Sequence, residues 1–172
     1  MAAIFILICF GMVFSIVLWS LRMGIAPMPT TQKAKRALLS LLPPECEGVV
    51  YELGSGWGNL AWALAKRYPK AQIRAYEMSP IPYFFAKLCF SAPNLHYFRR
   101  DFRDISLKNA DLIVCYLYPG AMQQLKVKFE QELKPGTFIA SNTFAIPGWK
   151  PEKAVKLDDL YRTPIYLYIR TL

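Results

Sequence analysis

Residues 49–59 combine an apolar run, an acidic side chain and a glycine loop in an order that suits ligand binding. Val49–Leu53 is short, apolar and partly β-branched, which predicts a buried strand. Glycines then follow at alternate positions: Gly54, Gly56 and Gly58. Glycine accepts a positive φ and lets a ligand approach the backbone without meeting a Cβ atom. From Leu60 to Pro69 the apolar spacing is helical, so the first N–H groups of a helix are predicted to face the ligand.

The glycine spacing differs from two common nucleotide-binding motifs. A dinucleotide fingerprint requires Gly-x-Gly-x-x-Gly, and Asn59 occupies its third glycine position. A P-loop ends in Gly-Lys-Ser/Thr, which is absent here. The pattern present is acidic-x-Gly-x-Gly-x-Gly, beginning at Glu52. A tight strand-to-helix turn without a ligand is the competing interpretation of the loop alone.

A second acidic residue, Glu77, directly follows the next predicted strand, Ala71–Tyr76. It lies 23 residues after Gly54. An acidic residue about 20 residues beyond the first glycine is placed to accept hydrogen bonds from ribose hydroxyls. The alternative is a solvated glutamate at a strand end, and the upstream glycine loop favours the ribose role.

The remaining patterns predict an α/β fold with a doubly wound, mostly parallel sheet and an antiparallel edge. Strands are predicted, in chain order, at residues 49–53, 71–76, 94–100, 112–118, 137–142, 154–157 and 165–170. Helices are predicted around residues 34–42, after the glycine loop, from Ser79-Pro80 onward, and from Met122 to Leu133. The connection from Asp104 to Ala110 is too short for a further helix.

Three features together resemble the class I S-adenosylmethionine-dependent methyltransferases. They are the run Glu52-Leu53-Gly54-Ser55-Gly56-Trp57-Gly58, the acidic Glu77, and the Leu133-Lys134-Pro135-Gly136 step before the fifth strand. The resemblance runs from about Thr30 to Leu172 and implies a Rossmann-like fold with S-adenosylmethionine as cofactor. It also implies that Asp101 meets the adenine amino group, with Asp104 as a neighbouring alternative. The residues expected to bind the cofactor are Glu52, Gly54, Ser55, Gly56, Trp57, Gly58, Glu77, Met78, Asp101 and Phe102.

Methyl transfer from a sulfonium is an in-line displacement in which positioning supplies much of the acceleration. Tyr116 and Tyr118 end the predicted central strand near the expected methyl site, and they are the candidate catalytic residues. One of these rings, or Trp57, is suited to face the sulfonium or an amine acceptor through cation–π attraction. The alternative is a packing role for all three. No residue stands out as a general base.

Residues 2–21 are twenty consecutive uncharged residues and predict a single transmembrane helix, since such a helix is about 30 Å long. No Lys or Arg precedes the run, which argues against a secretory signal peptide. The chain therefore divides into a transmembrane anchor, 1–23, and a methyltransferase domain, 24–172. Basic residues follow the anchor, at Arg22, Lys33, Lys35 and Arg36. By the positive-inside rule the domain is expected to face the cytoplasm.

The anchor, the compact size and the Pro29-Thr30 step resemble a narrower branch of the family. Its members are the small membrane-anchored protein-lysine methyltransferases that modify ATP synthase c subunit and the adenine nucleotide translocase. This resemblance implies a protein lysine as acceptor, on a protein or membrane-embedded partner. The alternatives are a lipid or small-molecule acceptor, a nicotinamide-nucleotide-binding protein, or a non-catalytic protein that keeps the fold.

Charge and composition narrow the partners further. The net charge of +9 suits anionic lipid, and the anchor favours lipid over nucleic acid as the basic surface's partner. His96 is the only histidine, and the four cysteines are far apart, so no metal site is expected.

Overall fold

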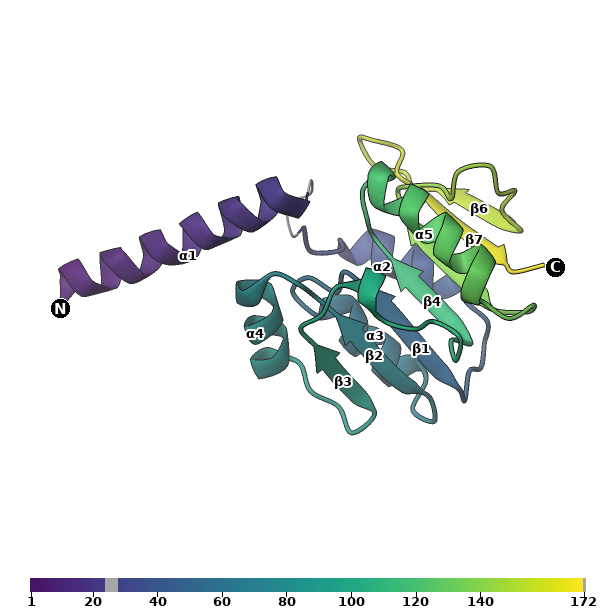
Figure 1. The fold of residues 1–172 in the computed structure, drawn as a ribbon, viewed down its shortest axis with the longest axis horizontal. Helices are drawn as coiled ribbons and strands as arrows, with labels where there is room; N and C mark the ends of the chain where they lie inside the picture. Colours follow the sequence, from purple (N-terminus) through teal and green to yellow (C-terminus); the bar gives the residue numbers. More distant parts are fainter. Residues whose placement is uncertain (24–27, 172) are drawn as a thin grey trace.

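The computed structural model describes residues 1–23 and 28–171. Its centre is a seven-stranded sheet of order β3-β2-β1-β4-β5-β7-β6 (Figure 1). The strands are β1 (Val49–Leu53), β2 (Gln72–Tyr76), β3 (Leu95–Phe98), β4 (Leu112–Cys115), β5 (Phe138–Asn142), β6 (Lys153–Lys156) and β7 (Pro164–Ile169). β3, β2, β1, β4 and β5 are parallel, whereas β7 is antiparallel to both β5 and β6. The predicted mixed sheet with an antiparallel edge is confirmed.

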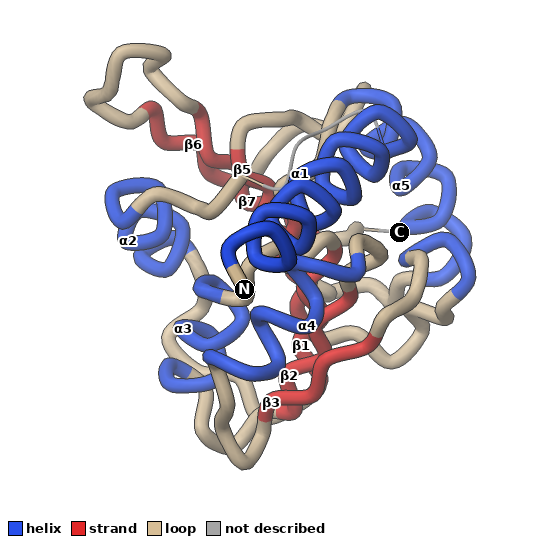
Figure 2. The backbone as a smooth tube through the Cα atoms, turned by 90° about the vertical axis from the view of Figure 1, so that its left-hand side faces the viewer, coloured by secondary structure: helices blue, strands red, loops and turns tan. Residues whose placement is uncertain are grey.

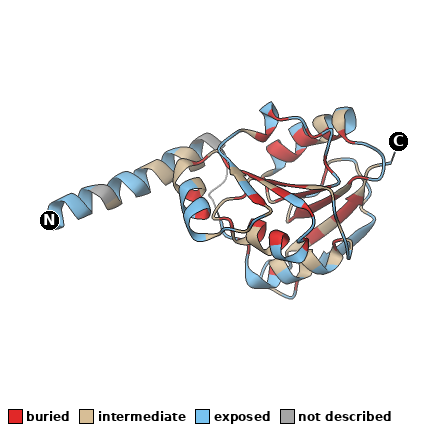
Figure 3. Ribbon diagram, turned by 90° about the horizontal axis from the view of Figure 1, so that it is seen from below, coloured by how far each residue is buried: buried red, intermediate tan, exposed pale blue. Residues whose placement is uncertain are grey.

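The helices are α1 (Ala2–Met23), α2 (Gln32–Leu41), α3 (Asn59–Arg67), α4 (Pro80–Cys89) and α5 (Pro119–Glu132), with a short 3₁₀ helix, η1 (Phe102–Asp104). One hydrophobic core joins the sheet to α2 and α3, with Leu38 and Leu64 fully buried. The other joins the opposite face to α5, around Phe129 and Ile113. Helices thus cover both faces, as a doubly wound sheet requires, and the buried residues concentrate in and beside the sheet (Figure 3).

α1 differs from the other helices because it projects from the domain and its side chains are largely exposed (Figures 1 and 3). Among the described residues it is the one helix long and apolar enough, by length and composition, to cross a membrane. It contacts α4 where it meets the domain. Neither hydrophobic core contains a residue of α1.

The central strand is shorter than its sequence predicts. β4 ends at Cys115, whereas the apolar run continues to Tyr118. The physical reason is Pro119, which begins α5 at its first position and holds Tyr118 in an extended conformation as the N-cap. Tyr116 and Tyr118 therefore lie in the loop between β4 and α5, at the carboxyl edge of the sheet.

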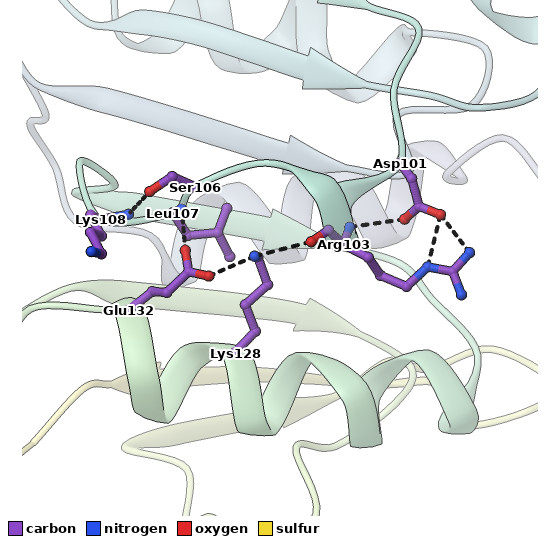
Figure 4. A network of polar contacts seen from close by, with 7 residues as sticks. All are labelled: Asp101, Arg103, Ser106, Leu107, Lys108, Lys128 and Glu132. Carbon is purple, nitrogen blue, oxygen red and sulfur yellow. Dashed lines mark hydrogen bonds and ion pairs between the residues drawn. The ribbon is translucent and has the colours of Figure 1, made fainter.

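The short connection between β3 and β4 contains η1 and a loop. No α-helix was predicted there, and none forms among these residues. Two side chains of α5 attach this loop to that helix through polar contacts (Figure 4). Glu132 accepts a hydrogen bond from the Leu107 N–H at 2.7 Å and pairs with Lys128 at 2.6 Å. Lys128 Nζ in turn donates to the Arg103 carbonyl at 3.2 Å. The missing helix is thus replaced by polar contacts to the neighbouring helix.

Candidate cofactor-binding site

A cavity opens at the carboxyl edge of the sheet, beside the ends of β1, β2 and β4. The strand order reverses between β1 and β4, and such switch points are where open α/β sheets bind ligands. The lining residues are Met28, Thr30, Glu52, Gly54, Ser55, Gly56, Trp57, Asn59, Tyr76, Glu77, Met78, Ser79, Arg100, Phe102, Tyr116 and Leu117. They include eight of the ten residues expected to bind the cofactor, all except Gly58 and Asp101.

The glycine loop adopts the conformation that its residue types favour. Gly54, Gly56 and Gly58 all have positive φ, at 76°, 52° and 83°. The N–H groups of Gly54 and Ser55 both donate to the Tyr76 carbonyl at 2.9 Å, which ties the loop to the end of β2. A Cβ atom on Gly54 would lie 2.7 Å from Leu117, whereas one on Gly56 would meet nothing within 4 Å. Gly56 therefore leaves its backbone open toward the cavity.

Glu77 has a structural role that its position in the sequence did not reveal. Its Oε2 accepts a hydrogen bond from the Gly56 N–H at 2.8 Å, and its Oε1 accepts one from Ser79 at 2.7 Å. One carboxylate thus joins the glycine loop to the start of α4. A carboxylate offers about four acceptor sites, so two remain for ribose hydroxyls after these bonds. The predicted ribose role is compatible with this geometry and remains a prediction.

The cavity wall contains polar atoms that lack a hydrogen-bond partner within the protein. These are Glu52 Oε2 and the hydroxyl of Ser55, and both residues are buried. Buried polar groups are normally paired, so unpaired ones beside a cavity indicate a ligand's polar groups. Burial, and then the negative charge of Glu77, raise the pKa of Glu52 well above its ordinary value. A cationic ligand group beside Glu52 would offset that cost. S-adenosylmethionine carries such a cationic amino group together with its activated methyl group, so these residues fit the cofactor.

Gly58 lies outside the cavity and serves packing instead. It is the N-cap of α3, and a Cβ atom there would lie 2.7 Å from the Cβ of Ala86 in α4 and 2.8 Å from the hydroxyl of Tyr97 in β3. In the dinucleotide motif the third glycine allows close helix packing, and Asn59 occupies its position here. Gly58, one residue earlier, provides that close packing instead. The expectation that Gly58 contacts the cofactor gains no support from its position.

Asp101 is also separated from the cavity lining. Its carboxylate accepts hydrogen bonds from the backbone N–H and guanidinium of Arg103 (Figure 4). Burial raises its pKa, but the hydrogen bonds and charge of Arg103 outweigh burial and leave the pKa below its ordinary value. The neighbours Arg100 and Phe102 line the cavity in its place. Its predicted contact with adenine remains a prediction.

The two candidate catalytic tyrosines have different surroundings. Tyr116 lines the cavity and its ring stacks with Phe144, with centroids 6.4 Å apart. Tyr118 is the N-cap of α5, and its ring lies against Gly120, where an added Cβ would come within 2.8 Å of it. Trp57 also lines the cavity and packs edge-on against Phe85 of α4 at 5.3 Å. The structure therefore brings Tyr116 and Trp57 to the cavity but not Tyr118.

The segment that follows α1 forms part of the same wall, which sequence reasoning missed. Met28 and Thr30 line the cavity, and the Asn59 side chain donates to the Thr30 carbonyl at 2.9 Å. The Thr31 hydroxyl then caps α2 by accepting from the Ala34 N–H at 3.2 Å. The signal for this wall in the sequence is the Pro29-Thr30 step.

This strand order, the glycine loop after β1 and the acidic residue after β2 are those expected of an S-adenosylmethionine-dependent methyltransferase. Residues 52–153 match the family described as the ANTKMT methyltransferase domain, and the chain belongs to that family. A protein-lysine N-methyltransferase of Saccharolobus islandicus is 26% identical over 152 residues, which cover 83% of this chain and 91% of that protein. The adenine nucleotide translocase lysine N-methyltransferase of Mus musculus is 27% identical over 139 residues. That match covers 78% of this chain and 60% of the mouse protein.

Solved structures agree with the fold and the cofactor. An RNA methyltransferase from Salinibacter ruber, in complex with S-adenosyl-L-homocysteine, has a TM-score of 0.73 and 25% identity. The similarity covers 83% of this chain and 93% of that one. The fibrillarin/Nop5p complex contains a chain of the same fold, with a TM-score of 0.63. The protein is therefore an S-adenosylmethionine-dependent methyltransferase, and its fold is shared by enzymes with different acceptors.

Proposed function

We propose that this protein is a membrane-anchored methyltransferase that modifies a lysine on a membrane protein. Two relatives are protein-lysine methyltransferases, which supports a lysine acceptor. The observation that supports membrane anchoring is that residues close to α1 in the chain line the cavity. Met28 and Thr30 line the cavity and follow α1, the candidate span, after a short connection. In this proposal residues 1–23 are the anchor, residues 24–172 are the catalytic domain, and the domain faces the cytoplasm.

The proposed roles of the site residues follow from their surroundings. Glu52 and Ser55 have unpaired polar atoms for the amino-acid end of the cofactor, and Glu77 has acceptor sites left for ribose. Tyr116 and Trp57 present aromatic rings to the cavity, where cation–π attraction orients an amine or the sulfonium. An acceptor lysine must be neutral to attack, and its ordinary pKa is about 10.4. Methylation is therefore expected to speed up as pH rises toward that value.

The test begins with calorimetric titration of S-adenosylmethionine into the full-length protein in detergent. The protein is then incubated with isolated membranes and labelled cofactor, and mass spectrometry identifies the methylated residue. Methyl-lysine on a membrane protein supports the proposal. If the label is instead found in extracted lipid, in RNA or in a small molecule, the proposed lysine acceptor is wrong, although the protein is still a methyltransferase.

A pair of substitutions at Tyr116 separates its ring from its hydroxyl. Tyr116→Phe keeps the stacking on Phe144, so turnover is expected to stay near that of the parent. Tyr116→Leu removes the ring and is expected to lower turnover about tenfold, the effect of losing a cation–π contact of about 1.4 kcal/mol. Tyr118→Phe is the matched control outside the cavity. A large loss in Tyr116→Phe would instead assign the role to the hydroxyl.

A further inference from the structure

The apolar stripe of α4 faces outward, although its pattern is that of a buried helix face. Ile81, Phe84, Phe85 and Leu88 follow the i, i+3, i+4, i+7 spacing that normally packs on a core. In the structure Pro82 and Ala86 form the buried side of the helix. Phe84, Phe85 and Leu88 are 59%, 45% and 86% exposed. A stripe of this kind on a surface marks an interaction site.

Exposed apolar residues outside α1 concentrate around the cavity edge. Among the described residues that follow α1 in the chain, nine large apolar side chains are exposed, and seven of these lie on α4 or at the carboxyl edge of the sheet. Those seven are Met28, Phe84, Phe85, Leu88, Phe98, Leu160 and Tyr161. The last two lie in the β6–β7 turn, which reaches this edge because Ile165 of β7 pairs with Asn142 at the end of β5. Val127 on α5 and Val155 on β6 are the exceptions.

α1 leaves the domain from the same side. It contacts α4, and in Figure 2, which looks onto this side, the two helices lie next to each other. Met23 ends α1 and Met28 lines the cavity, so five residue steps join the two. Even fully extended, five steps span at most about 18 Å. If α1 crosses a bilayer, the cavity edge and α4 must therefore lie close to the bilayer surface.

The charges around the stripe also suit a lipid surface. Lys87 lies on α4, while Arg99 and Arg100 follow β3 at the same edge, and all three residues are exposed. Lysine and arginine beside apolar residues can reach lipid headgroups while their apolar neighbours enter the interface. Acidic residues are also present here. Asp101 and Asp104 follow Arg100, and Asp101 pairs with Arg103. Asp158 and Asp159 are in the β6–β7 turn, where Asp158 pairs with Lys33 at 3.7 Å.

We infer that the outward face of α4, formed by Phe84, Phe85 and Leu88, rests in the bilayer interface beside α1. This inference depends on the proposed membrane anchoring and adds a second contact to it. A helix alone allows the domain to rotate about its tether, whereas two contacts fix which side faces the membrane. Phe85 packs against Trp57 of the cavity wall, so this contact also holds the cavity mouth at the headgroup level.

The experiment places a nitroxide label on full-length protein in vesicles of phosphatidylcholine and phosphatidylserine. Cys9, Cys46 and Cys89 are first replaced by serine or alanine, while buried Cys115 is kept. Single labels are then introduced by Leu88→Cys, by Val127→Cys as the exposed control on α5, and by Val13→Cys within α1. Collision rates with oxygen, which partitions into lipid, and with a water-soluble nickel chelate are measured at each position.

The expected result is a ratio of oxygen to nickel collisions at position 88 that approaches the ratio at position 13 and exceeds that at position 127. Frequent nickel collisions at 88 with a lipid value at 13 would overturn the inference while leaving the anchor in place. Low collision rates with both reagents at 88 would indicate a protein partner and would also overturn it. A water value at position 13 would remove the membrane anchoring itself, and the inference with it. None of these readouts depends on methyl transfer.

Discussion

At the scale of single residues, the Glu77 side chain holds the glycine loop in place and also has acceptor sites left for the predicted ribose contact. Its hydrogen bonds to Gly56 and Ser79 fix the glycine loop against the start of α4 before any cofactor binds. Hydrogen bonds to a charged group contribute about 1.5–3 kcal/mol each. Loss of cofactor binding in a Glu77 variant would therefore report loop order as well as any ribose contact.

Glu77→Gln replaces one acceptor oxygen by an N–H₂ group that faces a backbone N–H. We expect cofactor affinity to fall at least about tenfold, because one charge-assisted bond is lost. Hydrogen exchange of the Gly56 amide in the cofactor-free protein should become faster, which a ribose contact alone would not change. Unchanged exchange together with weaker binding would assign Glu77 to the cofactor and not to the loop.

Gly58 and Gly136 provide a matched pair for separating backbone strain from packing. Both have positive φ, but a Cβ at Gly136 meets nothing within 4 Å while one at Gly58 meets Ala86 and Tyr97. Gly136→Ala is expected to lower the free energy of unfolding by about 1–2 kcal/mol. Gly58→Ala should lower the free energy of unfolding by about 1–3 kcal/mol more than Gly136→Ala does, because the added methyl group would overpack against Ala86 and Tyr97. Denaturant unfolding measures both, and equal losses would contradict the packing role.

The raised pKa of Glu52 predicts a pH dependence of stability. Between the ordinary glutamate pKa of about 4.3 and the raised folded-state value, the folded protein binds more protons than the unfolded chain. The free energy of unfolding of the cofactor-free protein should therefore fall as pH rises through this range. Glu52→Gln stays neutral and should flatten that part of the curve. Denaturant unfolding at a series of pH values makes the comparison, and identical slopes would refute it.

At the scale of elements, α1 and the domain are separable in energetic terms. The two cores contain no α1 residue, and Thr30 and Thr31, which follow α1, attach the chain to α3 and α2 through hydrogen bonds. α1 contacts the domain at α4. α1 therefore does not contribute to the packing of the sheet.

A chain of residues 24–172 is expected to keep the unfolding midpoint of the full-length protein to within a few degrees. The reason is that deletion of α1 removes no core residue, and a shift of about 2–4 °C corresponds to only about 1 kcal/mol in a domain near this size. Both proteins are compared by thermal unfolding in the same detergent. A loss of cooperative unfolding in the shorter chain would show that α1 is part of the folded unit.

At the scale of the whole molecule, the proposed anchor would confine the enzyme and its acceptor to one surface. Confinement raises the effective concentration of one partner around the other without any new contact. The open cavity edge beside α1 is consistent with an acceptor presented at that surface.

Full-length enzyme and acceptor in the same vesicles should therefore react at least about tenfold faster than the same proteins in separate vesicles, by this effective-concentration argument. Residues 24–172 should show no such difference, and they serve as the control. Methyl incorporation over time is the measurement. Equal rates in shared and separate vesicles would argue against a membrane-confined reaction.

Much of the fold followed from local patterns in the sequence. The order strand, glycine loop and helix at residues 49–69 follows from apolar runs and glycines. The position of Glu77 at the next strand end and the antiparallel edge were also predictable. These features depend on neighbours in the chain, or on the rule that parallel strands end at one edge.

Only the tertiary structure decided which residues contact one another in and around the cavity. It bonded Glu77 to Gly56, placed Gly58 against Ala86, paired Asp101 with Arg103, and turned the apolar stripe of α4 outward. The physical reason is that each of these depends on which segments become neighbours in space. Periodicity marks an apolar face but does not say which surface covers it.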